Sequence, residues 1–305
     1  MAFSVQPCNP NAQAGAKNVF RYLTELSEHG IITGQHTKTM GLEELRHIEQ
    51  VTGKKPALLG FELLSYSPNI NYWDTDEECM DEVAGNLGTL RRAWDWAAEK
   101  GLITLTWHWF SPLGGHGKSF FVDNTDFDAR RALRESTIEH EALIRVLDSM
   151  AGLLRPYRDK EVPILWRPFH EADGNWFWWG AGVIGSEVSK GLYRLMYERF
   201  TNLHRLNNLL WVWNSPRPQD YPGDDVVDFI SRDMYPPAHT HTAHEEKLKE
   251  LRQITSFDMR TRWYCWGFRF TSTRRNSSHP VAPTHCKPAK PSGRTLQFCR
   301  ATAPG

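Results

Sequence analysis

Short apolar runs alternate with longer amphipathic segments from about Gly30 to Asp258, and this alternation restricts the fold more than any other feature. Strands that alternate with helical crossovers form a parallel sheet covered by helices. Apolar residues recur at i, i+3 and i+4 in 128–154, 186–207 and 244–254, which predicts helices with one buried face. The predicted strands span residues 30–35, 56–63, 102–109, 162–167, 209–214 and 226–235.

Nearly every predicted strand ends in polar side chains that suit catalysis or ligand binding. In a (β/α)8 barrel all strand ends meet at one mouth, whereas an open sheet brings together only those beside its switch point. No Gly-rich phosphate loop follows the first strand, so nucleotide binding lacks its main motif. We therefore predict an α/β fold, a (β/α)8 TIM barrel in residues 30–258, with 1–29 as a lead-in. The polar strand ends are Gln35-His36, Glu62, His108, His170-Glu171, Asn214 and Tyr235.

Residues 259–305 depart from this pattern. They contain nine of the 36 Lys and Arg residues but none of the 36 Asp and Glu residues. Segment 263–270 could form a strand, but 271–305 shows no helical stripe, so we expect the barrel to be incomplete at its last two strand–helix units and the rest of this basic segment to be irregular. A frameshift or a mispredicted exon end explains the loss of acids better than a genuine tail on a sugar-binding barrel. Binding of polyanions by the basic tail is a third hypothesis, and it predicts salt-sensitive binding.

Composition and spacing argue against several other classes of protein. Residues 1–258 carry 27 basic and 36 acidic side chains, which gives no indication of nucleic-acid binding. No apolar stretch reaches 18 residues and no signal peptide is visible, so we expect a monomer with reduced thiols and no membrane association. The expected compartment is the cytoplasm, or an unknown one if the chain is a processed fragment. The five cysteines lack zinc spacing, and His239, His241 and His244 fit a solvated loop better than a metal site. We expect no metal and no cofactor.

Segment 162–180 carries the strongest chemical signal. An apolar strand runs into His170-Glu171, and a loop with Trp176, Trp178 and Trp179 follows. Apolar surroundings disfavour the ionised form of a carboxyl group, which suits a general acid. The chain has 13 Trp, several beside polar residues, and such indoles suit the C–H faces of pyranose rings. The alternative is a structural glutamate that caps a helix or pairs with Arg167.

The segment Arg167-Pro-Phe-His-Glu-Ala-Asp-Gly-Asn-Trp-Phe-Trp-Trp-Gly180 resembles the acid/base motif of glycoside hydrolase family 26, the β-mannanase family. The resemblance covers roughly residues 30–258. It implies a (β/α)8 barrel that cleaves internal β-1,4 links of mannans with retention of configuration, although some members act on mixed-linkage β-glucan or β-xylan. Further matching motifs are Gly34-Gln35-His36, Thr106-Trp107-His108-Trp109, Trp211-Val212-Trp213-Asn214 and Asp233-Met234-Tyr235-Pro236.

By position, the resemblance gives Glu171 the role of proton donor and acid/base, and makes His170 the histidine that precedes it. His108 matches the family's third-strand histidine, and Trp176 matches a loop tryptophan at the sugar-binding surface. Tyr235 matches the sixth-strand tyrosine that contacts nucleophile and sugar. We expect these side chains, together with Trp109 and Trp178, to line the sugar subsites.

The nucleophile is unknown. Retaining cleavage uses two carboxyl groups about 5–5.5 Å apart. The family's attacking glutamate stands at the end of the seventh strand, but no acid follows Asp258 here. Asp233 and Glu62 lie near the predicted mouth, although neither occupies the family's position. Two main hypotheses remain: a retaining endo-β-1,4-mannanase type of enzyme by ancestry, and a carbohydrate-binding pseudoenzyme. Both predict a β-linked polysaccharide or oligosaccharide partner, with mannan foremost.

Overall fold

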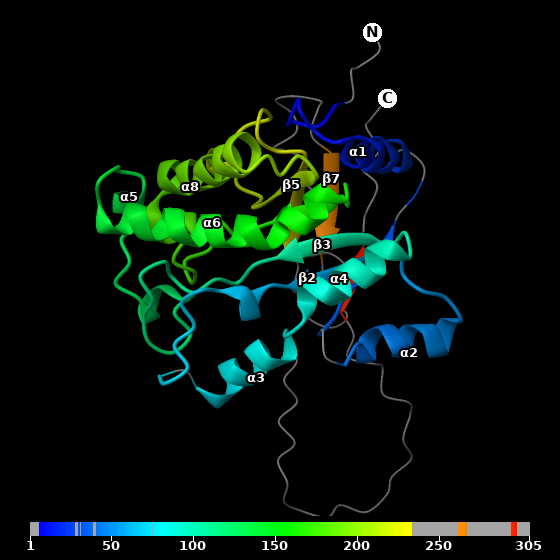
Figure 1. The fold of residues 1–305 in the computed structure, drawn as a ribbon, viewed down its shortest axis with the longest axis horizontal. Coiled ribbons are helices and arrows are strands. Elements are labelled where there is room, and N and C mark those ends of the chain that lie inside the picture. The colour runs from blue at the N-terminus through cyan, green and yellow to red at the C-terminus, as the bar shows by residue number, and fades with distance from the viewer. Residues whose placement is uncertain are drawn as a thin grey trace, which may run out of the picture.

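A sheet of sequential strands forms the centre of the molecule in the computed structural model, and helices pack around it (Figure 1). The structure describes residues 6–27, 30, 32–38, 41–74 and 76–233, and the backbone of two strands further along the chain. Strand order follows chain order from β1 to β8, and the sheet closes on itself.

The first six strands are all parallel to their neighbours, and each falls within or next to a predicted strand. Their carboxyl ends therefore lie at one edge of the sheet, as the prediction of a barrel mouth requires. They are β1 (Thr33–His36), β2 (Leu58–Glu62), β3 (Leu102–Thr106), β4 (Ile164–Arg167), β5 (Leu209–Asn214) and β6 (Phe229–Asp233).

The last two strands depart from a regular (β/α)8 barrel. Strand β7 (Arg262–Trp266) continues the parallel order beside β6, at the position where a strand was expected. Strand β8 (Arg294–Gln297), which the sequence did not predict, runs antiparallel to β1 and meets β7 through the single pair Cys265–Gln297. No helix follows β6 in the described part of the chain. The fold is thus a barrel of this type that is incomplete in its last two units; the predicted helix at 244–254 lies outside the described residues.

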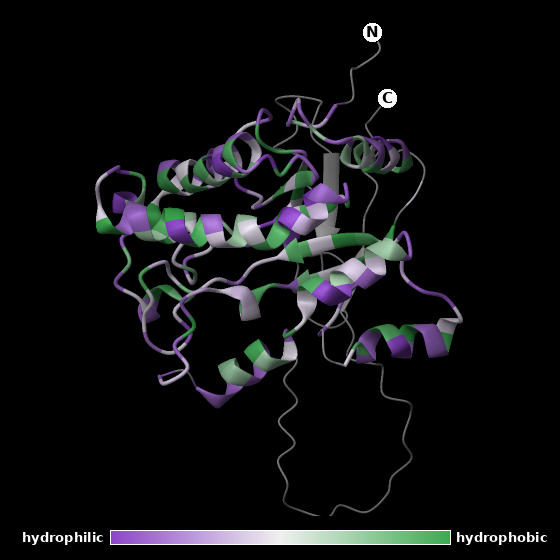
Figure 2. Cartoon of the chain, viewed as in Figure 1, coloured by the Kyte–Doolittle hydropathy of each residue, from purple (hydrophilic) through white to green (hydrophobic). Residues whose placement is uncertain are grey.

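Helices connect the first five strands, whereas only a 3-10 turn lies between β5 and β6. In α6 the side chain of Thr137 accepts a hydrogen bond from the backbone N–H of His140 at 3.1 Å, which caps the helix start. The apolar and polar residues of α6 alternate in bands along the helix (Figure 2). The helices are α1 (Ala14–Leu26), α2 (Glu43–Thr52), α3 (Glu77–Gly85), α4 (Thr89–Ala98), α5 (Ala129–Ala132), α6 (Ile138–Asp159), α7 (Ala181–Ile184) and α8 (Ser186–Glu198).

Short helical turns complete the description. Three are 3-10 turns and one is a π-helical turn directly after α8: Leu64–Tyr66, Val122–Asn124, Pro218–Asp220 and Arg199–Leu203.

The core has two parts. The larger contains most of the indoles, including Trp107, Trp109 and Trp211, and lies among the strands and the covering helices. The smaller joins Phe20 and Leu23 of α1 to residues at the strand starts, including Leu58 and Phe229. Helix α1 therefore packs across the amino-terminal end of the sheet, which leaves the carboxyl ends for a binding site.

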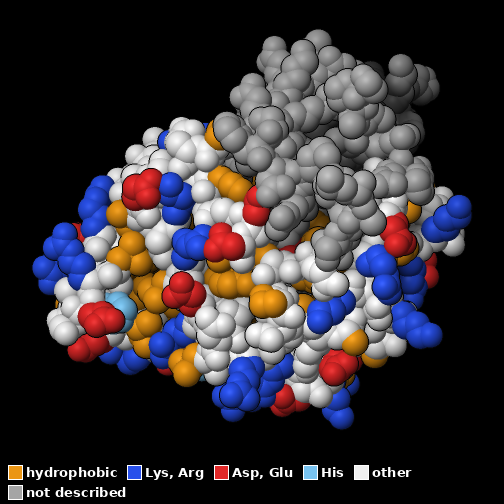
Figure 3. Space-filling model, turned by 90° about the horizontal axis from the view of Figure 1, so that it is seen from above, with side chains coloured by type: hydrophobic (Ala, Val, Ile, Leu, Met, Phe, Trp, Pro, Cys, Tyr) orange, Lys and Arg blue, Asp and Glu red, His pale blue; other side chains and the backbone are white. Residues whose placement is uncertain are grey.

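The surface seen from above carries basic and acidic side chains interspersed with apolar ones (Figure 3). None of the helices in the described residues has the length and apolar character needed to cross a membrane.

Candidate active site

A cavity of about 500 Å³ opens at the carboxyl ends of the strands. Side chains from β1, β2, β3, β4 and β6 reach it, so it stands where the barrel fold places active sites. Its strand-end lining consists of His36, Glu62, Thr106, His108, Arg167, His170, Glu171 and Asp233.

Glu171 follows strand β4 in a left-handed backbone conformation, with φ of 52°. Such a conformation costs on the order of 1–3 kcal/mol for a residue with a side chain, so its neighbours must hold it. The backbone N–H of Glu171 donates to Asn214 Oδ1, and Glu171 O accepts from the N–H of Gly174 at 3.0 Å. These contacts fix the backbone that carries the carboxyl group to the cavity wall.

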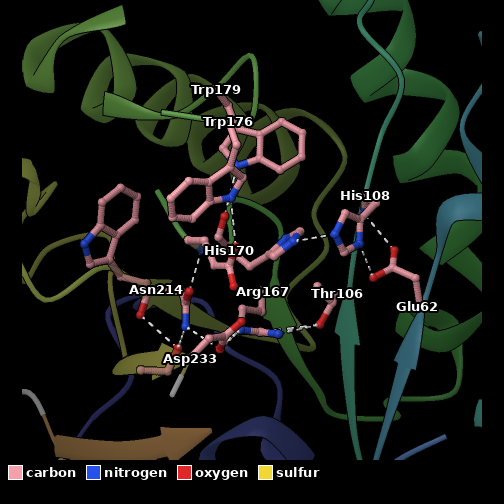
Figure 4. A network of polar contacts seen from close by, with 12 residues as sticks. Glu62, Thr106, His108, Arg167, His170, Trp176, Trp179, Asn214 and Asp233 are labelled. Atoms are coloured by element: carbon pink, nitrogen blue, oxygen red, sulfur yellow. Dashed lines mark hydrogen bonds and ion pairs between the residues drawn. The ribbon is translucent and has the colours of Figure 1, made fainter. Parts of the chain in front are cut away.

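Trp176 forms a hydrogen bond with the Glu171 carboxyl group. Its indole Nε1–H donates to Glu171 Oε2 at 2.9 Å, and the indole is 42% exposed while lining the cavity (Figure 4). A Cβ at Gly174 would lie 2.6 Å from Cε2 of this ring. Only glycine at this position therefore leaves room for the indole where it stands, and the exposed part of the ring remains accessible.

Two histidines and a glutamate of the cavity lining, His108, His170 and Glu62, form a hydrogen-bonded chain (Figure 4). His108 Nδ1 lies 2.8 Å from Glu62 Oε2, and His108 Nε2 lies 2.9 Å from His170 Nε2. An ionised carboxylate only accepts, so His108 Nδ1 carries a proton. In a neutral His108, Nε2 then accepts from His170 Nε2–H. Burial above all, with the positive charge of Arg167 and the repulsion that a protonated His108 would add, lowers the pKa of His170 well below its usual value and keeps its ring neutral.

An ion pair forms the floor of the cavity. Arg167 Nη1 donates to Asp233 Oδ1 at 2.6 Å, and both side chains are almost fully buried. Asn214 Nδ2 donates to the same oxygen at 3.1 Å, and Arg167 also donates to Thr106 Oγ1. Burial raises the pKa of Asp233, while the Arg167 guanidinium opposes that rise. The Asp233 carboxyl group is thus held by hydrogen bonds from Arg167 and Asn214.

The structure brings four of the predicted site residues together, because His108, His170, Glu171 and Trp176 all line the one cavity. Tyr235 lies outside the described residues.

The structure does not bring Trp109 and Trp178 into the lining. Both are buried, with 0% and 1% exposure, and the indole Nε1–H of Trp178 donates to the backbone carbonyl of Trp109 at 3.1 Å. Their rings pack edge to face with centroids 4.6 Å apart. They belong to the buried core and do not line the cavity.

Sequence reasoning missed part of the lining. Lys118 pairs with Glu82 at 3.5 Å and with Glu78 at 3.9 Å, which brings helix α3 to the cavity. The aromatic residues of the loop after β3 were a usable signal, whereas nothing in the sequence shows which helix faces the mouth. The missed lining residues include Glu78, Glu82, Asn86, Lys118, Phe120, Phe121 and Phe177.

The described residues contain no group of three or more His, Cys, Asp or Glu side chains placed to hold a metal ion. The histidines considered above for a metal, His239, His241 and His244, lie outside the described residues.

Known proteins resemble this chain in sequence. A mannan endo-1,4-beta-mannosidase of Thermothelomyces thermophilus is 38% identical over 235 residues, which are 74% of this chain and 45% of that protein. One of Bacillus subtilis is 30% identical over 252 residues, which are 77% of this chain and 67% of that protein. The chain thus spans less than half the length of the first relative.

Solved structures resemble the fold. A GH26-CBM35 β-(1,4)-mannanase of Podospora anserina has a TM-score of 0.73 at 33% identity, over 87% of this chain and 57% of that one. A β-mannanase from a symbiotic protist of the termite Reticulitermes speratus, complexed with gluco-manno-oligosaccharide, has a TM-score of 0.74 at 29% identity, over 86% and 82%. The model of glycosyl hydrolase family 26 matches residues 8–257 and ends where the acid-free segment begins. The chain belongs to glycosyl hydrolase family 26.

Proposed function

We propose that the cavity binds a β-1,4-linked mannan chain and that Glu171 protonates the oxygen of the departing sugar, as in a retaining endo-β-mannanase. The observation that carries the proposal is the placement of Glu171: its carboxyl group lies at the cavity wall and Trp176 Nε1–H donates to one of its oxygens at 2.9 Å. The relatives named as mannanases support mannan as the substrate, and mixed-linkage β-glucan and β-xylan are the alternatives to test beside it.

The attacking group is a separate question, because both other carboxylates at the strand ends of the lining, Glu62 and Asp233, are engaged by close partners. Glu62 bonds to His108 and to two backbone N–H groups, and Asp233 bonds to Arg167 and Asn214. Strand β7, where the family's nucleophile is expected, reads Arg-Trp-Tyr-Cys-Trp and contains no carboxyl group. We therefore propose that Glu171 acts as the proton donor in this chain and that no second carboxylate acts as the nucleophile.

An external nucleophile tests this arrangement directly. With phenyl β-mannobioside and azide, azide attacks the anomeric carbon from the α face. The bond to the phenol oxygen then breaks, and that oxygen takes the proton of Glu171. We expect azide to accelerate phenol release and to give an α-mannosyl azide. Glu171→Gln should lower the azide-dependent rate by about 10²-fold or more, whereas Glu187→Gln, an exposed position on α8, should leave it unchanged.

A carbohydrate-binding role without catalysis is the second candidate, and the engaged carboxylates favour it. It predicts saturable binding of mannohexaose, weakened by Trp176→Ala, with no turnover in the presence or absence of azide. Absence of both binding and turnover for mannan, glucan and xylan oligosaccharides would rule out both candidates.

A further inference from the structure

A fully buried carboxyl group, that of Asp220, lies in the 3-10 turn after strand β5 and does not line the cavity. A carboxylate removed from water needs a cation and hydrogen bonds to replace its hydration. Arg217 Nε forms an ion pair with Asp220 Oδ2 at 3.0 Å, and Ser186 Oγ donates to Asp220 Oδ1 at 2.6 Å. Ser215 Oγ donates at 3.5 Å. These partners belong to two connections, one after β4 and one after β5, so the carboxyl group joins the two.

A first path from Asp220 to the proton donor runs through Arg217. While Arg217 Nε pairs with Asp220, its Nη1 donates to the backbone carbonyl of Asp173 at 3.3 Å. Asp173 lies two residues after Glu171, and the N–H of Gly174 donates to the Glu171 carbonyl at 3.0 Å. The guanidinium group thus holds the turn 171–174, which carries the proton donor.

A second path runs through the start of α8. Ser186 is the first residue of that helix, and the short helix α7 precedes it. The N–H of Ala181 in α7 donates to the Ala172 carbonyl at 2.7 Å, and the N–H of Gly182 donates to the Gly174 carbonyl at 3.0 Å. Helix α7 is therefore bonded to the same turn, and the hydrogen bond of Ser186 fixes the end of this connection to the buried carboxyl group.

A third path is the shortest. Ser215 directly follows Asn214, whose side chain accepts from the Glu171 N–H and whose carbonyl accepts from the Ala172 N–H at 3.0 Å. Ser215 Oγ also accepts from the backbone N–H of Arg217 at 3.2 Å. All three paths end on the turn 171–174, where Glu171 has a left-handed backbone that only its surroundings can maintain.

We propose that Asp220 is a positioning residue for the proton transfer, because it holds the turn that aims the Glu171 carboxyl group at the oxygen of the departing sugar. The proposal rests on the function proposed above. Asp220 lies outside the cavity lining, so it acts on the reaction only through the backbone of Glu171. Without the buried carboxylate, Arg217 and Ser186 lose their common acceptor and the turn relaxes. The proton donor then leaves its productive geometry, whereas the rest of the cavity keeps its shape.

The azide-dependent release of two leaving groups tests the proposal. Phenolate leaves only with the proton of an acid, whereas 2,4-dinitrophenolate leaves without one. We expect Asp220→Ala to lower the rate on phenyl β-mannobioside about ten- to a hundredfold and to keep the rate on 2,4-dinitrophenyl β-mannobioside within about twofold. Glu171→Gln should show a larger loss of the same selective kind. Both substrates meet one protein sample, so a smaller folded fraction lowers both rates equally and leaves their ratio unchanged.

Three further variants accompany this measurement. Arg217→Met removes the first path alone from a side chain that is 36% exposed, and it should give a smaller selective loss. Asp220→Asn can still accept from Arg217 and donate to Ser186 Oγ, so it should retain a ratio nearer to the wild type. Asp225→Ala is the matched control, since Asp225 lies in the same connection and forms an ion pair with Arg194, but its side chain is 63% exposed. It should keep both rates.

Each other outcome overturns a defined statement. If Glu171→Gln shows the selective loss while Asp220→Ala and Arg217→Met lower both rates together, Asp220 positions nothing and the proposed function stands. An equally selective loss in Asp225→Ala would show that Asp220 has no particular role. If Glu171→Gln lowers both rates equally, Glu171 is not the proton donor and the proposed function fails. If the wild type releases neither leaving group with azide, both statements fail.

Discussion

The imidazole Nε2 atoms of His108 and His170 lie 2.9 Å apart, so the two rings share a hydrogen bond that only one of them can donate. Glu62 Oε2 accepts a hydrogen bond from the other ring nitrogen of His108, Nδ1. A second proton on the buried His170 would therefore be repelled by Arg167 and by any charge on His108, and His170 Nδ1 has no hydrogen-bond acceptor among the described residues. The pair is built to hold a neutral His170.

This arrangement predicts an acid-sensitive component of stability. The pKa of His170 is lowered in the folded state, so below about pH 6.5 the unfolded chain binds more protons than the folded chain. The free energy of unfolding then falls as pH falls through that window. Urea unfolding between pH 5 and 7.5 should show this slope in the wild type and a smaller slope in His170→Gln. The exposed His116→Gln is the control that keeps the wild-type slope; equal slopes in all three proteins would contradict the assignment.

Glu62 is the anchor of the same chain of hydrogen bonds. Its Oε1 accepts from the backbone N–H groups of Leu63 and His108, and its Oε2 accepts from His108 Nδ1. Glu62→Ala leaves three donors without an acceptor and should lower the free energy of unfolding by about 3 kcal/mol. Glu62→Gln can keep Oε1 in place and donate to Nδ1 of His108, so it should lower the free energy of unfolding by only about 1 kcal/mol. Thermal and urea unfolding measure both, and equal losses would sink the argument.

Gly174 determines the position of the Trp176 indole. A Cβ at Gly174 would lie 2.6 Å from two ring atoms, so Gly174→Ala must displace the ring that bonds to Glu171. We expect mannohexaose affinity to fall as much as in Trp176→Ala, about tenfold. Gly152→Ala on α6 is the matched control, since a Cβ there meets nothing within 4 Å. Unchanged affinity in Gly174→Ala would show that the indole does not contact the sugar.

The sequence predicted the six parallel strands and the position of Glu171 because both depend on local patterns. A polar pair after an apolar strand can only stand at the strand's carboxyl end, and four of the predicted lining residues meet there. The sequence could not show which of Trp176 and Trp178, two positions apart on one loop, lines the cavity. The Trp176 ring does so, whereas the Trp178 indole donates to the Trp109 carbonyl in the core.

Features set by distant segments were not predictable. The contact between Lys118 and Glu82 depends on how helix α3 packs beside the loop after β3. The left-handed backbone of Glu171 depends on Asn214, which lies 43 residues further along the chain. The antiparallel β8 has no local signal that separates it from an irregular segment.

The ion pair beneath the cavity gives the most demanding prediction. Arg167 Nη1 and Asp233 Oδ1 are 2.6 Å apart, and both side chains are almost fully buried. Removal of one charge therefore leaves the other desolvated and without its charged partner. Arg167→Met should lower the free energy of unfolding by about 3–5 kcal/mol, and Asp233→Leu by a similar amount. The double variant should lose much less free energy of unfolding than the sum of the two single losses, because an apolar pair needs no charged partner.

The oligosaccharide affinity of the double variant should nevertheless fall. Asn214 Nδ2 then loses the Asp233 acceptor, and Asn214 Oδ1 no longer holds the Glu171 backbone as firmly. Urea unfolding and calorimetry on the four proteins of this cycle separate the two effects. Additive losses of stability would show that the two charges do not stabilise each other, and full affinity in the double variant would show that the floor does not position Glu171.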